Sequence, residues 1–224
     1  MDYANDLIES MNPDQLAAFK RIKYAIENNL PNRQFFLDGP GGSGKTYVYI
    51  AVYYYFTAMK KSVICMASTG IAAILLPHGR TVHTTFALDV PLRHDSVSNI
   101  KTRTSAAALR LLEADIIIWD EAPMSPVYAL KNVDELLKKL EENNKPFGGK
   151  VMLLGGDFRQ CLPVSRTDVQ YEKVSLSIKF WGQWDMFITL PLKINERVNQ
   201  ALLKGNIVQA EVLNKFAKWV LKVK

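Results

Sequence analysis

Residues 39–46 of the chain read Gly39-Pro40-Gly41-Gly42-Ser43-Gly44-Lys45-Thr46 and fit the phosphate-loop pattern of Gly, four residues and Gly-Lys-Thr. Glycines let successive backbone N–H groups turn inward around a polyphosphate, and the N-terminus of a following helix adds partial positive charge. In such a loop the Lys45 ammonium reaches the outer phosphates, and the Thr46 hydroxyl ligates Mg²⁺. The sequence therefore predicts a protein that binds a nucleotide together with Mg²⁺.

The residues on either side of the loop support this interpretation. Residues 34–38 predict a short buried strand, and the apolar run after the loop predicts a helix from Thr46 to about residue 60. Most residues between 47 and 56 have high strand propensity, but a phosphate loop requires a helix after it, so we expect the motif to override the propensity. A flexible Gly-rich turn is the alternative, and the strand–loop–helix order argues against it.

The rest of the chain alternates predicted strands and helices. Further strands are predicted at residues 62–67, 115–119, 150–154 and 187–190, and further helices at residues 12–29, 71–76, 81–86, 106–113, 126–143 and 206–224. This order predicts an α/β fold in which helices cover both faces of a parallel sheet. The last helix has a single polar stripe, so we expect it to be well buried or to pack on something absent from the chain.

Composition limits the class of protein. The chain has 224 residues, of which 48% are hydrophobic, which is enough for one α/β domain or a tight pair of domains with a sizeable core. The net charge of +6 weakly favours a polyanionic partner such as nucleic acid. Two distant cysteines predict reduced thiols, and the chain start lacks the basic region of a signal peptide. We therefore expect an intracellular protein without a membrane partner, nuclear or mitochondrial in a eukaryote and otherwise cytoplasmic.

Asp120 and Glu121 follow a predicted apolar strand, where an acidic pair would face a bound nucleotide. Asp120 would hold Mg²⁺, and Glu121 would polarise the water that attacks the γ-phosphate. The alternative is a pair of surface acids at the start of a helix. The pair indicates ATP hydrolysis rather than transfer to an acceptor, because a kinase gains nothing from an activated water.

Gln160 follows the next predicted strand, close to Asp157 and Arg159. An amide at this place can bind both the γ-phosphate and the attacking water, and would thereby sense whether ATP is intact. A polar turn without such a role is the alternative. The position of Gln160 at the strand end after the acidic pair favours the sensing role.

Two roles are open for Gln15, near the start of the first long predicted helix. As the third helical residue it can close a capping box with Asn12, which is a structural role. Its amide can instead bind the edge of an adenine held over the nearby phosphate loop, because an amide both donates and accepts hydrogen bonds. The spacing alone favours neither role.

The ordered set of motifs resembles the PIF-type (petite-integration-frequency) DNA helicases, relatives of RecD in superfamily one. The segments that carry the resemblance read Asn-Pro-Asp-Gln from Asn12, the phosphate loop from Gly39, Ala-Ser-Thr-Gly-Ile-Ala-Ala from Ala67, Gly-Arg-Thr-Val-His from Gly79, Asp-Glu-Ala-Pro-Met from Asp120 and Gly-Gly-Asp-Phe-Arg-Gln-Cys-Leu-Pro-Val from Gly155. The Asp-Glu-Ala-Pro-Met motif and Leu-Lys-Ile-Asn-Glu-Arg from Leu192 are most similar to the branch that includes Helitron-transposon helicases. The resemblance runs from about residue 12 to residue 224.

The resemblance implies an ATP-driven motor that moves 5′→3′ on single-stranded DNA, unwinds duplex junctions and acts as a monomer on a RecA-like core. Such helicases take part in DNA repair, recombination and telomere maintenance. The resemblance also favours the adenine role for Gln15. It implies that Arg197 stabilises charge on the transferring phosphoryl group.

By the same resemblance, a DNA-binding surface includes Ser68, Thr69 and Gly70 and continues over Thr81 and His83. Hydroxyls and backbone N–H groups there suit phosphate oxygens whatever the base sequence. The alternative for Ser68 or Thr69 is a plain helix N-cap. Residues 87–105 match the place of a small wedge-like insertion.

The helicases of this family have a second RecA-like lobe, which completes the ATP site and the DNA track. The motifs of this sequence match the first lobe only. We expect residues 1–224 to form the first motor lobe alone, with the second lobe in a full-length protein. Two other functions compete with the helicase interpretation. They are a small-molecule P-loop kinase and a non-catalytic, nucleotide-dependent DNA-binding module.

Overall fold

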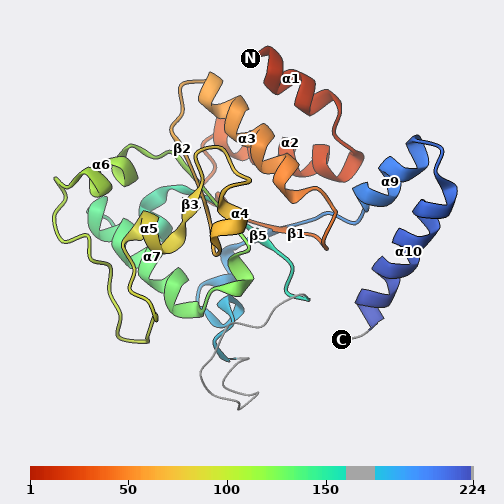
Figure 1. The fold of residues 1–224 in the computed structure, drawn as a ribbon. Helices are drawn as coiled ribbons and strands as arrows, with labels where there is room; N and C mark the ends of the chain where they lie inside the picture. Colours follow the sequence, from red (N-terminus) through yellow and green to blue (C-terminus); the bar gives the residue numbers. More distant parts are fainter. Residues whose placement is uncertain (160–174, 223–224) are drawn as a thin grey trace.

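A computed structural model describes residues 1–159 and 175–222 and has one parallel sheet at its centre (Figure 1). The strands are β1 (Gln34–Asp38), β2 (Val63–Ala67), β3 (Arg80–Thr81), β4 (Ile116–Asp120), β5 (Val151–Gly156) and β6 (Ile188–Pro191). They lie in the order β3-β2-β4-β5-β1-β6, and every neighbouring pair is parallel. The carboxyl ends of the strands therefore share one edge of the sheet, where α/β proteins bind their ligands.

Helices cover both faces of the sheet, as the sequence predicts (Figure 1). The first face carries α1 (Asp2–Glu9), α2 (Pro13–Glu27) and α3 (Lys45–Ala58), and the second carries α5 (Val82–Phe86), α6 (Ala106–Glu113) and α7 (Val127–Leu140). Side chains alternate between the two cores: Phe35 and Leu37 face the first, and Phe36 faces the second. The predicted RecA-like α/β fold is confirmed.

The α3 segment is helical despite its strand propensity, as the sequence predicts. Burial explains why. Val48, Tyr49 and Val52 are fully buried against the sheet, and Phe56 lies in the same core. Tertiary packing of these large side chains outweighs propensities that differ by less than about 1 kcal/mol per residue.

The remaining described elements are α4 (Gly70–Ala73), α9 (Glu196–Leu203), α10 (Ile207–Lys222) and the 3₁₀ helices Ala122–Met124, Pro146–Gly149, Ile178–Phe180 and Trp184–Met186. The sequence patterns do not predict α1, α9 or the two-residue strand β3. Residues 87–105 contain no helix or strand; buried Leu88 and Ile100 anchor them beside α5. Their role as a wedge-like insertion stays a prediction.

The last helix lies apart from the sheet and packs on α9 (Figure 1). Of its described side chains, Ala210 is buried, whereas Val208, Val212, Phe216 and Trp219 are all more than half exposed. The expectation that this helix is well buried within the chain is therefore wrong. The other expectation, that it packs on something absent here, stays a prediction.

Two further sequence expectations concern the thiols and membranes. Cys65 is a free, buried cysteine, and burial raises the pKa of its thiol to about 12, so it stays protonated. Cys161 lies outside the described residues. Among the described helices, none combines the length and apolar character that crossing a membrane requires.

Candidate nucleotide-binding site

The phosphate loop joins β1 to α3 at the carboxyl edge of the sheet. Gly42 and Gly44 have φ angles of +86° and +81°, which favour glycine. A Cβ at Gly42 would lie 3.1 Å from Arg197 Cδ, and a Cβ at Gly44 would overlap the Gln15 amide. Both glycines are thus required by backbone conformation and by close neighbours. In this conformation Lys45 Nζ donates a hydrogen bond of 2.7 Å to the Gly39 carbonyl.

Gln15 closes the capping box with Asn12 that is one of its two predicted roles. Its N–H donates to Asn12 Oδ1 (3.0 Å), and its Oε1 accepts from the Asn12 N–H (3.1 Å). Its Nε2 also donates to the Ser43 carbonyl (3.3 Å), which ties α2 to the phosphate loop. The structural role is therefore confirmed, and the adenine role stays a prediction.

A later segment, residues 192–197, lies over the phosphate loop. The Asp14 carboxylate accepts hydrogen bonds from the N–H groups of Lys193 (2.8 Å) and Ile194 (3.1 Å). The Glu196 N–H donates to the Gly42 carbonyl (2.8 Å), and Asn12 Nδ2 donates to the Glu196 carboxylate. We call these hydrogen bonds of Asn12, Asp14 and Gly42 to residues 192–197 the latch. The latch places the exposed Arg197 side chain beside Gly42. The structure thus brings Asn12, Gln15, the phosphate loop and Arg197 together.

The acidic pair occupies the end of β4 at the same edge. Asp120 is buried, and its Oδ1 accepts a hydrogen bond from the Glu121 N–H (2.9 Å). Glu121 has φ +51°, a left-handed conformation that costs a non-glycine residue about 1–2 kcal/mol. The Ser68 hydroxyl donates to the Glu121 carbonyl (2.7 Å) and helps to hold this turn. The turn holds the two carboxylates at the carboxyl end of β4, ahead of the 3₁₀ helix Ala122–Met124.

Burial raises the pKa of both carboxyl groups of the pair. For Glu121 the charge of Asp120 raises the pKa further, whereas the nearby Lys45 ammonium lowers it. For Asp120 the Glu121 N–H and the Lys45 charge oppose the effect of burial. The Lys45 ammonium therefore favours the charged form of both carboxyl groups. A raised pKa makes Glu121 a better proton acceptor, as a general base requires.

The fit of a metal-bound nucleotide can be judged from buried polar atoms around the loop. Ser43 is fully buried, and neither its Oγ nor the Tyr49 hydroxyl meets a hydrogen-bond partner among the described residues. Orphaned polar atoms are rare in folded proteins and suggest a ligand or solvent partner. Together with the glycine-lined loop and the acidic pair, they fit a magnesium-bound polyphosphate.

The motif around Gln160 is described only in part. Asp157 Oδ1 accepts hydrogen bonds from the Arg159 N–H (2.9 Å) and Nε (2.6 Å). Arg159 Nη2 also contacts Asp38, the last residue of β1, at 3.3 Å. These contacts join the end of β5 to the strand that leads into the phosphate loop. Gln160 itself lies outside the described residues, so its sensing role stays a prediction.

The predicted DNA-binding residues lie at the carboxyl ends of β2 and β3, and their hydroxyls already make hydrogen bonds. Ser68 Oγ accepts from Trp119 Nε1 (3.0 Å) in addition to its bond to the Glu121 carbonyl. Thr69 and Thr81 cap α4 and α5 through side-chain acceptors, so the N-cap alternative is confirmed for Thr69. Gly70 is exposed. DNA contacts by these residues stay a prediction.

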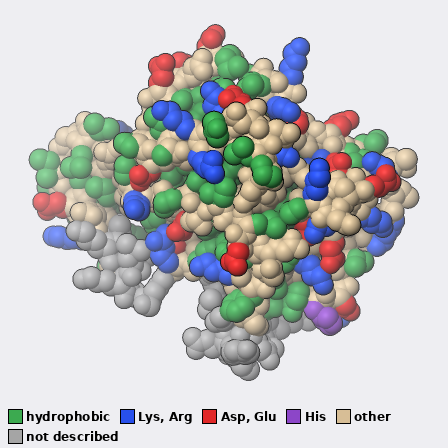
Figure 2. All heavy atoms as spheres, turned by 180° about the vertical axis from the view of Figure 1, so that it is seen from behind, with side chains coloured by type: hydrophobic (Ala, Val, Ile, Leu, Met, Phe, Trp, Pro, Cys, Tyr) green, Lys and Arg blue, Asp and Glu red, His purple; other side chains and the backbone are tan. Residues whose placement is uncertain are grey.

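Burial lowers the pKa of His83 below its usual value, so the imidazole is neutral at pH 7. On the face shown in Figure 2, basic and acidic side chains are interspersed rather than gathered into one basic patch. The net charge of +6 is therefore not concentrated on that face. His83 and that face supply little of the strong positive field that attracts nucleic acid from a distance.

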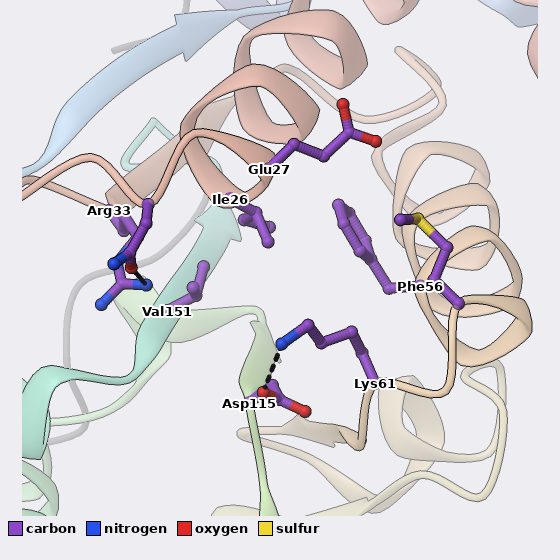
Figure 3. A pocket seen from close by; sticks show the side chains of 9 residues that line it. Ile26, Glu27, Arg33, Phe56, Lys61, Asp115 and Val151 are labelled. Carbon is purple, nitrogen blue, oxygen red and sulfur yellow. Dashed lines mark hydrogen bonds and ion pairs between the residues drawn. The ribbon is translucent and has the colours of Figure 1, made fainter.

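A cavity of about 560 Å³ lies at the opposite edge of the sheet (Figure 3). Its charged lining groups are already paired: Lys61 Nζ bonds Asp115 (2.9 Å), and Arg33 Nη1 bonds Asn29 (2.7 Å). Glu27 accepts from the Tyr55 hydroxyl (2.8 Å). These bonds occupy the cations of the lining, and Glu27 and Asp115 add negative charge, so the cavity suits a polyphosphate less well than the phosphate loop does.

A sequence model described as PIF1-like helicase matches residues 10–224. The chain belongs to the PIF1-like helicase family. The ATP-dependent DNA helicase Pif1 of Psychrobacter is 34% identical over 152 residues, which cover 66% of this chain and 23% of that protein. The Pif1 helicase of Bdellovibrio bacteriovorus is 30% identical over 196 residues, which cover 86% of this chain and 41% of that protein.

Solved PIF1-like helicases share the fold. A crystal structure of a double mutant of Bacteroides Pif1 has a TM-score of 0.65 and 25% identity, over 84% of this chain and 43% of that one. The chain thus spans less than half of the length of these relatives. The family match gives no support to the small-molecule kinase alternative.

Several residues of the site were not singled out from the sequence. Asp14 and Glu196 form the latch over the phosphate loop, and Asp38 binds Arg159. The latch joins residues about 180 positions apart, so no local pattern reveals it. The place of Tyr49 near the site could have been inferred from the sequence. It lies three residues after Thr46, and helix periodicity puts the two residues on the same side of α3.

Proposed function

We propose that the chain is the nucleotide-binding lobe of an ATP-dependent DNA helicase that moves 5′→3′ on single-stranded DNA. One observation carries the proposal. Three segments far apart in sequence, namely the phosphate loop, the Asp120–Glu121 turn and the Arg197 segment, converge on one edge of the sheet. Phosphoryl transfer requires phosphate binding, a base for water and charge stabilisation together, and these segments supply them.

In the proposed reaction Lys45 binds the outer phosphates, and Glu121 accepts the proton of the attacking water. Arg197 compensates negative charge on the transferring phosphoryl group, and Gln160 senses the γ-phosphate. Thr46 and Asp120 would hold Mg²⁺, which supplies positive charge to the β- and γ-phosphates when bound. The pKa-raising burial of Glu121 supports its assignment as the base.

The DNA part of the proposal rests on relatives and on the surface residues. Solved structures of Bacteroides Pif1 include a complex with single-stranded DNA and one with ADP-AlF4. For this chain, Ser68, Thr69, Gly70, Thr81 and His83 are the proposed phosphate contacts, with a second RecA-like lobe completing the track. We propose a monomeric motor acting at duplex junctions in genome maintenance.

Substitution of Lys45 tests the nucleotide site. Lys45→Ala is expected to weaken Mg-ATP binding at least about 30-fold, because the phosphate charge loses a half-buried cationic partner. Unfolding should change little, since Lys45 makes one hydrogen bond to its own loop. Isothermal titration calorimetry measures the affinity, and urea unfolding checks the fold. Lys61→Ala, which removes an ammonium of a surface ion pair with Asp115, is the matched control. Wild-type affinity in Lys45→Ala would remove the proposed role.

Gln15 provides a test of base selection. Gln15→Ala is expected to lower the free energy of unfolding by about 1 kcal/mol, because the capping box is lost. It is also expected to lower the ratio of ATP to GTP affinity. Gln34→Ala is the control, since Gln34 is also buried and its amide bonds the Lys150 carbonyl far from the loop. A loss of stability with an unchanged ratio would leave Gln15 with the structural role alone.

A further inference from the structure

The phenol of Tyr49 is a buried polar group to which the reaction above gives no role. Tyr49 lies in α3, three residues after Thr46, and its side chain is fully buried. Its hydroxyl meets no hydrogen-bond partner within residues 1–159 and 175–222. A phenylalanine would fill the same space without burying an unpaired hydroxyl, which is unfavourable in a protein interior. Packing alone therefore does not explain the hydroxyl.

The position of the hydroxyl follows from the sheet register. Trp119 of β4 pairs with Leu154 of β5, so the next residues, Asp120 and Gly155, lie side by side. The Tyr49 hydroxyl occupies the place that a Cβ at Gly155 would take. The phenol thus crosses over β5 at a glycine and ends beside the carboxylate of Asp120. Gly155 makes this approach possible, because any larger residue would displace the ring.

The chemistry of the two groups is complementary. A phenol is protonated at neutral pH, so the Tyr49 hydroxyl can donate a hydrogen bond. A protonated phenol needs an acceptor, and the carboxylate of Asp120 is the acceptor beside it. In the present conformation the Asp120 Oδ1 is turned to the Glu121 N–H (2.9 Å).

We propose that Tyr49 is a positioning residue whose hydroxyl donates a hydrogen bond to the Asp120 carboxylate and orients it toward the metal of a bound Mg-nucleotide. This inference rests on the proposed function, because it requires the Mg-nucleotide site. The groups that orient metal-binding side chains typically change metal affinity about 10- to 100-fold when they are removed. Tyr49 thereby links the first turns of the phosphate-loop helix to the acidic pair two strands away.

The test compares nucleotide binding by the whole chain with and without metal. The dissociation constant for a fluorescent ADP analogue is measured in Mg²⁺ and in EDTA, and their ratio gives the metal-dependent gain in affinity. Tyr49→Phe is expected to reduce this gain about 10-fold and to leave affinity in EDTA unchanged. The urea midpoint without nucleotide should stay the same or rise, because an unpaired buried hydroxyl is removed.

Tyr55→Phe is the matched control. It makes the same chemical change in the same helix, but it removes a bond to Glu27 at the opposite edge of the sheet. A normal metal-dependent gain in Tyr49→Phe would overturn the inference, and so would an equal loss of the gain in Tyr55→Phe. If Lys45→Ala abolishes binding while Tyr49→Phe keeps the full gain, this inference fails and the proposed nucleotide site stands. If Lys45→Ala binds normally, the proposed site and this inference fail together.

Discussion

A forked duplex with a 5′ single-stranded tail is expected to stay intact when this chain acts on it alone, even with saturating Mg-ATP. The reason is geometric. Arg197 is the arginine that the structure places beside the phosphate loop, and its side chain is exposed. An arginine held against the transferring phosphoryl group typically accelerates phosphoryl transfer about 10³–10⁵-fold. This acceleration requires a site from which water is excluded, because water screens the charge of the arginine. A single lobe also has nothing to close against during an ATP cycle.

The assay for this prediction is strand displacement followed by gel or fluorescence, with a full-length Pif1 helicase on the same fork as positive control. Binding of the chain to the single-stranded tail should be partial, weaker at high salt and independent of base sequence, because it rests on phosphate contacts. ATP-dependent unwinding by the monomeric 224-residue chain would refute the single-lobe account.

Glu121→Gln is expected to separate binding from hydrolysis in a two-lobed protein that contains this lobe. Mg-ATP should still bind, because Lys45, Thr46 and Asp120 remain. Turnover should fall at least about 10²-fold, which is the usual contribution of a general base. The amide cannot accept the proton from water, although it has nearly the same shape as the carboxylate.

The measurement is steady-state phosphate release with saturating single-stranded DNA, paired with equilibrium binding of Mg-ATP. Glu135→Gln is the control, since Glu135 is an exposed carboxylate on α7 that forms an ion pair with Lys131, one turn earlier in the same helix (3.8 Å). Near-normal turnover in Glu121→Gln would mean that another group acts as the base. A loss of Mg-ATP binding would assign Glu121 to the metal site instead.

Local patterns made the core of the site predictable. The phosphate loop requires Gly42 and Gly44 at φ values that other residues avoid, so a short run of consecutive residues predicts its geometry. The strand that ends at Asp120 was equally predictable, because its apolar residues are buried on both faces of the sheet. Even α3, whose residues favour strands, was predictable from the loop that precedes it.

Contacts between distant residues were not predictable in this way. The bonds of Asp14 to the N–H groups of Lys193 and Ile194 depend on how the last strand returns beside β1. The place of Tyr49 beside Asp120 depends on the register of β4 against β5 and on Gly155. The sequence left two alternatives open for α10, which lies apart from the sheet (Figure 1), because an apolar helix gives the same pattern whether its partner lies inside the chain or outside it.

The central claim is that residues 39–46 form a site for one Mg-nucleotide. Equilibrium titration of the wild-type chain with ATP, in Mg²⁺ and then in EDTA, tests it most directly. We expect saturable binding at one site per chain, with a dissociation constant between about 1 μM and 1 mM. Binding should be tighter in Mg²⁺ than in EDTA, and ADP should compete with ATP. If binding does not saturate at ATP concentrations well above about 1 mM, or if Mg²⁺ does not strengthen it, residues 39–46 do not form this site.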